Sequence, residues 1–248
     1  MFSNDNTQLL NANFDNANKL LSFNEPFDRF GVVTYGLGAL NLRTAQSLIP
    51  EFEKSLVDNK EKLSVYQFAE KLSKFFIEQW KLLMDKNFQP AAGQGMIFNV
   101  AGFDDNEPYG TIYQFEIPSQ PKPIEQNQKI NHQYTFGISG GGQHEIMSRL
   151  LTGYDQRLLQ ILIQNGLATA DQINKILLPA LAPLRLQVPF QFMPLQDCVN
   201  LAVLLIKTTI EAQSLAIGVR GCGGAIDVAI IKKNEPLKFI AKKDINVN

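Results

Sequence analysis

The first apolar runs of the chain are short and bounded by polar turns. They are KLLSF at positions 19–23 and RFGVVTYG at positions 29–36, and both are rich in β-branched or other large apolar residues. The residues between them, NEPFD, contain Pro26 and are typical of a turn. The pattern predicts two strands that pair antiparallel.

Apolar residues then recur at helical spacing over positions 39–57 and again over positions 65–84. Pro50 lies inside the first segment, where its missing backbone N–H should kink a helix. In the second segment a stripe of large side chains runs between charged positions and comprises Phe68, Leu72, Phe75, Phe76, Trp80 and Leu83. We therefore expect two amphipathic helices.

Three further strands are expected in the middle of the chain. GMIFNVAGFD and YGTIYQFEIP have strand composition and are joined by a hairpin turn, DDNEPYG. The segment at positions 119–131 is polar and rich in Pro and Gln, which predicts a loop. HQYTFGIS at positions 132–139 predicts another strand.

The rest of the chain reads as helices followed by two closing strands. Helices are expected over positions 143–163 and 194–213, and Thr169 with Gln172 has the spacing of a capping box for another. AIDVAIIKK and LKFIA predict the closing strands. Because hairpins replace regular βαβ crossovers, the order favours an α+β fold of two mainly antiparallel sheets packed face to face, with helices outside.

Length and composition favour one large domain over residues 1–248, since 45% of the residues are hydrophobic and no repeat or linker interrupts the chain. The net charge is −1 and the basic residues are scattered, which argues against nucleic acid or an anionic membrane as partner. Two cysteines without a CxxC motif and two histidines do not form a zinc set, and we expect no cofactor.

The cellular location follows from the start of the chain and its most apolar segment. The start is polar and acidic and lacks the features of a secretory signal. The most apolar run, at positions 198–206, is followed by Lys207 and is too short to span a bilayer, so we expect a buried helix. These features predict a cytoplasmic protein.

Three glycines, Gly140–Gly142, stand between the last of the middle strands and a helix. The P-loop and GxGxxG patterns are both absent. A helix start can bind an anion through its free N–H groups, so a phosphate or carboxylate site is one interpretation. The favoured interpretation is a tight corner that needs positive φ.

Other chemical motifs have plainer interpretations. Ser139 and His144 do not have the spacing or third member of a catalytic triad. The acidic turn at positions 104–107 is too short for a calcium loop and is expected to be solvated. Cys222 has only Arg220 nearby in the sequence to activate a thiol, and a small residue in a bend is favoured. By pattern alone, Lys19 is a strand-end lysine that faces water.

Several segments, taken in order, resemble the β-type subunits of the 20S proteasome and their bacterial proteasome-like relatives, which are N-terminal-nucleophile (Ntn) hydrolases. The similar segments are KLLSF, GVVTYGLGAL, FNVAGFDDNEPYGTIYQFEIP, FGISGGGQHEIMSRL and TTIEAQSLAIGVRGCGGAIDVAII. They cover nearly the whole chain from about Lys19 to Ile240, and their shared order is more specific than any one motif. The resemblance implies a four-layer αββα sandwich.

The resemblance also implies threonine-type hydrolysis of peptide or amide bonds, within a homo-oligomer. In such enzymes an N-terminal Thr attacks the carbonyl carbon, and its own α-amine acts as base, directly or through water. By motif, Lys19 matches the lysine that lowers the pKa of the nucleophile. Gly36 matches the backbone N–H that stabilises the oxyanion, and Ser139 matches the serine near the free amine.

Two departures from the family pattern set the catalytic expectation. The first two strands of the family, which carry the nucleophile, need more than the eighteen residues before Lys19, and Ser3 and Thr7 lie in a polar stretch. The supporting acid before the last strand is also not visible, because Gln213 and Ser214 stand in that region. Either the nucleophile lies upstream or this member has lost its catalytic strand, and the chain as given is expected to be inactive.

Two alternatives come from other function classes. One is a non-catalytic oligomeric assembly or scaffold subunit, which would form stable oligomers without hydrolysis. The other is a small-anion-binding protein that uses the helix start after Gly140–Gly142.

Overall fold

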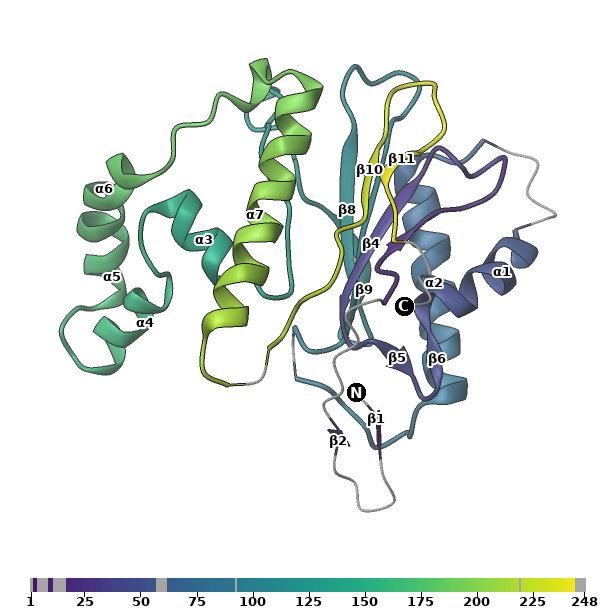
Figure 1. The fold of residues 1–248 in the computed structure, drawn as a ribbon, viewed down its shortest axis with the longest axis horizontal. Helices are drawn as coiled ribbons and strands as arrows, with labels where there is room; N and C mark the ends of the chain where they lie inside the picture. The colour runs from purple at the N-terminus through teal and green to yellow at the C-terminus, as the bar shows by residue number, and fades with distance from the viewer. Residues whose placement is uncertain are drawn as a thin grey trace. The chain divides into compact units, whose positions relative to one another are not determined.

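The computed structural model describes residues 2–3, 9–10, 17–56, 62–91, 93–218 and 220–243 (Figure 1). The chain forms two compact units. The first comprises Met1–Ser139 with Asp227–Asn248, and the second comprises Gly140–Ile226. Helices and antiparallel sheets are combined in the described residues, so the predicted α+β class is confirmed.

The main sheet of the first unit has five strands in the order β3-β4-β7-β8-β9, and all neighbours are antiparallel. These strands are β3 (Leu20–Leu21), β4 (Gly31–Gly36), β7 (Met96–Gly102), β8 (Thr111–Ile117) and β9 (Gln120–Glu125). The pairing predicted for positions 19–23 and 29–36 is confirmed, since Leu20 lies opposite Val33. The predicted hairpin is also confirmed, as β7 followed by β8.

Two predictions around β9 are wrong. The expected loop at 119–131 contains this strand, because β9 is last in the sheet order and an edge strand tolerates the missing N–H groups of Pro121 and Pro123. The strand expected at 132–139 does not form. The chain turns through positive φ at Asn131 and His132, and an isolated bridge joins Ile130 to Gln133 across this turn.

The helix expected at 39–57 begins later than predicted. Helix α1 spans Ala45–Ser55, with Thr44 as its N-cap, and Pro50 lies inside it. The residues before it form a small hairpin of β5 (Ala39–Leu40) and β6 (Arg43–Thr44), which turns at Asn41 with a φ of 54°. Residue 57 lies outside the described residues.

Helix α2 (Val65–Leu83) matches its prediction closely and begins with a capping box formed by Ser64 and Gln67. Its apolar face packs against β7, β8 and β9. Phe68 is fully buried at the centre of the core, with its ring 4.2 Å from that of Phe30 and 4.9 Å from that of Phe23. An aromatic cluster therefore joins this helix to the sheet.

The two predicted closing strands are confirmed as an antiparallel hairpin of β10 (Val228–Ile230) and β11 (Lys238–Ala241). The Leu237 N–H donates to the carbonyl oxygen of Asp28 at 2.7 Å. Side chains of Ile231 and Leu237 lie against the α-carbon of Gly31 in β4. At the start of the chain, two short strands, β1 (Phe2–Ser3) and β2 (Leu9–Leu10), also pair antiparallel.

Every regular element in the described residues of the second unit is a helix or a helical turn. Its elements are α3 (Glu145–Thr152), α4 (Arg157–Gln164), α5 (Ala170–Gln172), the π-helical segment η1 (Ile173–Leu177), α6 (Leu178–Leu181), the 3₁₀ turns η2 (Ala182–Leu184) and η3 (Phe190–Phe192), and α7 (Leu195–Leu215). The predicted capping box of Thr169 and Gln172 is present.

The expectation of a buried helix at 198–206 is wrong. This run lies within α7, where only Leu205 and Thr209 are buried, while Leu204 and Ile206 are 55% and 47% exposed. The helix is apolar around much of its circumference, and a neighbour such as α3 covers only part of it. By length and composition alone, α7 is the one helix in the described part of the chain that could cross a membrane, a property it shares with core helices of soluble proteins.

Candidate functional site

The face of the five-stranded sheet opposite α2 carries polar side chains, and we call it the second face. Successive residues of a strand point to opposite faces, so the row of Val33, Asn99 and Gln114 lies opposite the buried neighbours Val32 and Phe98. Asn99 is only 9% exposed. A polar amide in the otherwise apolar run MIFNVAG is the feature of the sequence that marks this position.

A hydrogen-bonded chain crosses this face. The side-chain amide nitrogen of Gln114 donates both to the phenol oxygen of Tyr35 at 2.7 Å and to Oδ1 of Asn99 at 3.0 Å. Nδ2 of Asn99 in turn approaches Oγ of Ser139 at 3.5 Å. Ser139, a residue predicted from the family motif, is thereby placed at the second face.

Burial raises the pKa of the Tyr35 phenol, a hydrogen bond to Asn99 partly offsets this, and the charge of Glu116 raises it further. Tyr35 is subject to burial, to the Asn99 amide and to the Glu116 charge because it lies on the second face of the sheet. The phenol therefore stays protonated at neutral pH and can act as a hydrogen-bond donor.

Lys19 directly precedes β3, and Gly36 is the last residue of the neighbouring strand β4, so both lie at one end of this sheet. The Thr34 N–H donates to the carbonyl oxygen of Lys19 at 2.8 Å, and the Leu37 N–H donates to that of Gly95 at 2.9 Å. Because successive N–H groups of a strand point alternately to its two neighbours, the Gly36 N–H points to the Lys19 side. The Lys19 side chain is exposed, as the plain interpretation of its position predicts.

The conformation of Gly36 is fixed by the loop before β7. Gly36 has a φ of 79°, and a Cβ there would lie 2.2 Å from the carbonyl oxygen of Gly95. The Glu116 carboxylate accepts hydrogen bonds from the N–H groups of Gly93 and Gly95, both at 2.9 Å. This carboxylate holds the loop that packs on Gly36, so position 36 requires glycine for steric reasons as well.

A partly buried ion pair supports the segment that leads to Lys19. Nζ of Lys243 lies 3.3 Å from the Asp227 carboxylate, and the two side chains are 14% and 9% exposed. The same Nζ donates to the carbonyl oxygen of Ala17 at 2.9 Å. The pair thus joins the end of the first unit to the residues just before β3, a link that the sequence did not indicate.

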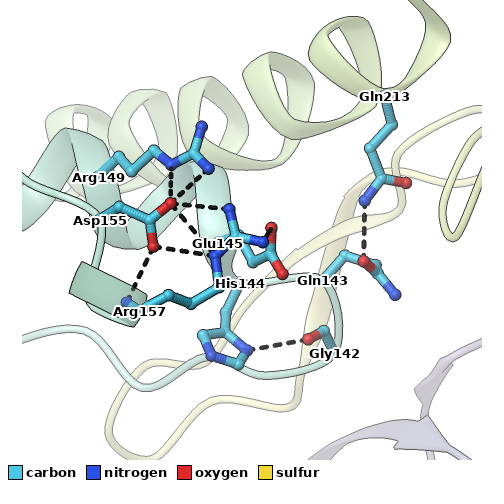
Figure 2. Close-up of polar contacts among 8 residues, drawn as sticks. All are labelled: Gly142, Gln143, His144, Glu145, Arg149, Asp155, Arg157 and Gln213. Atoms are coloured by element: carbon cyan, nitrogen blue, oxygen red, sulfur yellow. Dashed lines mark hydrogen bonds and ion pairs between the residues drawn. The ribbon is translucent and has the colours of Figure 1, made fainter. Parts of the chain in front are cut away.

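The glycine turn belongs to the second unit and is shown in Figure 2. Gly142 has a φ of 76°, and its carbonyl oxygen lies 3.0 Å from Nδ1 of His144. Glu145 occupies the first turn of α3, as predicted, and lies 3.3 Å from the guanidinium of Arg157. Its negative charge disfavours an anion at this helix start.

Charged groups beyond the turn form a compact cluster (Figure 2). The Asp155 carboxylate accepts from Nε of Arg149 at 2.9 Å and from the terminal guanidinium nitrogen of Arg157 at 2.8 Å. The hydrogen bonds from Arg157, and then that from Arg149, hold the pKa of Asp155 well below its usual range. The cluster connects α3 to α4.

Gln213 links α7 to both glycine segments of the second unit. Its Nε2 donates to Oε1 of Gln143 at 2.9 Å, and its Oε1 accepts from the N–H groups of Gly221 at 2.8 Å and Cys222 at 3.1 Å (Figure 2 shows the first contact). A Cβ at Gly221 would lie 2.5 Å from the Gln143 side chain. Gln213 therefore holds the bend in place, where an acid was expected by family analogy.

The acidic turn at 104–107 is occupied by structural contacts. Oδ1 of Asp104 accepts from the Val65 N–H at the start of α2, and Asp105 pairs with Lys62. Glu107 pairs with Lys129 at 3.0 Å. Among the described residues no group of three or more His, Cys, Asp or Glu side chains could hold a metal ion.

A cavity of about 290 Å³ lies near this turn. It is lined by Asp28, Arg29, Lys62, Phe103, Lys232, Asn234, Glu235 and Pro236. Lys62 and Arg29 both lie near the Asp105 carboxylate, and Lys232 pairs with Glu235. The positive charges of the basic side chains that line the cavity are therefore largely neutralised by these carboxylates.

A search against protein-family models gives no match to this chain, and no curated protein matches it. The candidate site therefore rests on the geometry of the second face and on the order of motifs along the chain.

Proposed function

We propose that the chain is a proteasome-like protein of the Ntn-hydrolase fold, whose family chemistry is threonine-type hydrolysis of peptide or amide bonds. The observation that carries the proposal is the hydrogen bond from the Thr34 N–H to the Lys19 carbonyl oxygen. It sets Lys19 beside β4, two residues from Gly36, whose N–H points to the same side. These are the lysine and the oxyanion donor that the motif resemblance names.

A two-sheet architecture is part of this proposal. The β10–β11 hairpin supports it, because Ile231 and Leu237 pack at Gly31, which shares a face of β4 with Val33 and therefore lies on the second face. In the proposed four-layer sandwich this hairpin belongs to the second sheet, and α1 and α2 form one outer layer.

The proposed mechanism needs a leading nucleophile whose own amine is the base. The Lys19 ammonium would lower the pKa of that nucleophile by its charge. The Gly36 N–H would donate to the oxyanion of the tetrahedral intermediate. The Ser139 hydroxyl would lie beside the amine and help to hold it, directly or through water.

The test is covalent labelling of the protein produced from its native gene. A peptidyl epoxyketone reacts with a hydroxyl and an adjacent free amine together, so it reports an N-terminal nucleophile. We expect one adduct on the N-terminal residue by intact mass and peptide mapping, and a rate of labelling reduced roughly 100-fold in Lys19→Ala. Lys54→Ala, on the last turn of α1, is the matched control and should be labelled at the wild-type rate.

A cooperatively folded wild-type protein that the probe does not label would contradict hydrolysis. That result would favour the second candidate, a non-catalytic oligomeric assembly subunit. The exposed apolar residues of the second unit support this candidate, since Leu215 and Ile217 are 87% and 107% exposed. Light scattering after size-exclusion chromatography would then show a defined homo-oligomer, and a monomer would exclude the assembly role.

A further inference from the structure

The Asn99 side chain occupies the centre of the polar chain on the second face. Its Oδ1 accepts from Gln114, so its Nδ2 is the atom that donates to Ser139. A hydroxyl has one proton and two lone pairs. When one lone pair of Ser139 accepts from Asn99, the rotation of the hydroxyl is restricted, and its proton and second lone pair remain for another partner.

The hydrogen bonds of Gln114 fix the orientation of the Asn99 amide. The Gln114 amide nitrogen uses its two protons on Tyr35 and Asn99, at 2.7 and 3.0 Å. Asn99 is 9% exposed, and its row in the sheet register places it directly opposite Gln114. An amide held in this way presents its nitrogen, and not its oxygen, to Ser139.

We propose that Asn99, oriented by Gln114, is a positioning residue that sets the direction of the Ser139 hydroxyl. This inference rests on the proposed function, in which Ser139 lies beside the free amine of the nucleophile. A hydroxyl set by Asn99 offers its proton and its remaining lone pair to that amine or to a bridging water in one fixed geometry. The Asn99–Ser139 separation of 3.5 Å is long, as is common for catalytic hydrogen bonds without substrate.

The first experiment needs no hydrolysis. Ser139→Cys is made in a Cys198→Ser, Cys222→Ser background, and the rate of alkylation by iodoacetamide is followed against pH. A donor at Asn99 stabilises the thiolate, so adding Asn99→Leu should move the midpoint up by about one pH unit. Asn99→Asp, which replaces the donor by a carboxylate, should move it up further.

The matched control is Gln120→Glu on β9, an exposed residue of the same sheet that donates to the Lys122 carbonyl oxygen. It should leave the alkylation midpoint where it was. An unchanged midpoint in Asn99→Leu would overturn the proposal, whether or not the epoxyketone labels the wild-type protein.

The second experiment separates positioning from packing. With Ser139 present, Asn99→Asp should reduce the maximal rate of epoxyketone labelling roughly tenfold without changing the probe concentration at half-saturation. In a Ser139→Ala background the same substitution should have no further effect. An equal loss in both backgrounds would show that Asn99 only supports the sheet. An unlabelled wild-type protein would refute the hydrolase function, and the thiol assay would then decide the inference by itself.

Discussion

The carbonyl oxygen of Gly95 lies 2.2 Å from the point where a Cβ at residue 36 would stand. Gly36 also has a φ of 79°, a conformation that L side chains rarely adopt. Because the loop at Gly95 is held by the Glu116 carboxylate, it cannot move away without loss of those hydrogen bonds. The bend after β4 is therefore a rigid feature of the first unit.

Gly36→Ala should lower the free energy of unfolding by about 3 kcal/mol, because it adds backbone strain and a close contact. Gly38→Ala is the matched control, since a Cβ there would meet nothing within 4 Å, and it should change stability by less than about 0.5 kcal/mol. Urea denaturation followed by circular dichroism measures both. Equal effects of the two substitutions would contradict the steric account.

Phe68→Ala should lower the free energy of unfolding by about 3–5 kcal/mol, because it empties the space between four other phenylalanine rings. These rings belong to Phe23, Phe27, Phe30 and Phe52, with centroids 4.9, 6.0, 4.2 and 5.6 Å from that of Phe68. Leu82→Ala on the same helix, where the side chain is 76% exposed, should have an effect below about 0.5 kcal/mol. If thermal and chemical unfolding show a small loss for Phe68→Ala, this core is not the one that stabilises the unit.

Asp227→Asn should lower the free energy of unfolding by about 2 kcal/mol, because it leaves the partly buried ammonium of Lys243 without its charge partner. Adding Lys243→Met should recover much of this loss, since both charges are then removed. A double-mutant cycle on urea midpoints measures the coupling. Additive effects of the two substitutions would show that the pair does not act as a unit.

The cluster around Asp155 should make stability depend on pH in the acid range. Its pKa in the folded state lies below the ordinary value of 3.8, because Arg157 and Arg149 stabilise the ionised carboxylate. The contribution to stability is therefore complete above the unfolded-state pKa and is lost as the pH falls below it. Above the unfolded-state pKa, the Asp155 carboxyl is ionised in both states, so its titration no longer changes the stability.

Asp155→Asn should consequently be less stable than wild type at neutral pH, and its stability should fall less steeply from about pH 4 to about pH 2. Replacing both Arg149 and Arg157 by Gln should flatten the same acid limb in part, because the guanidinium hydrogen bonds that lower the pKa of Asp155 are gone while the hydrogen bond from the backbone N–H of residue 157 remains. Urea midpoints at constant ionic strength across this range give the comparison. Parallel curves for wild type and Asp155→Asn would contradict the assignment.

Residues with strong local preferences behaved as the sequence predicted. The capping box at Thr169 and the apolar stripe of α2 depend on contacts within one or two helical turns, so sequence spacing alone reports them. The β7–β8 hairpin was predictable for the same reason, because a short turn brings adjacent strands together.

Elements that depend on distant partners were harder to predict. β9 contains Pro121 and Pro123 and reads as a loop until its place at the edge of the sheet is known. The segment at 132–139 has strand composition, yet Tyr134 and Phe136 pack instead on Tyr109, at ring distances of 4.9 Å each. Composition reports what a residue can pack against, and not which neighbour the fold supplies.

For the candidate site, the amino-acid sequence by itself determined the residue types and their order. These are Lys19, Gly36 at the end of β4, and Ser139 before the glycine turn. Only the tertiary structure decided that Asn99, Gln114 and Tyr35 meet on one face of the sheet and reach Ser139. The reason is physical. Local backbone preference acts over a few residues, whereas a hydrogen bond between strands exists only once the sheet register has been set by the burial of the opposite face.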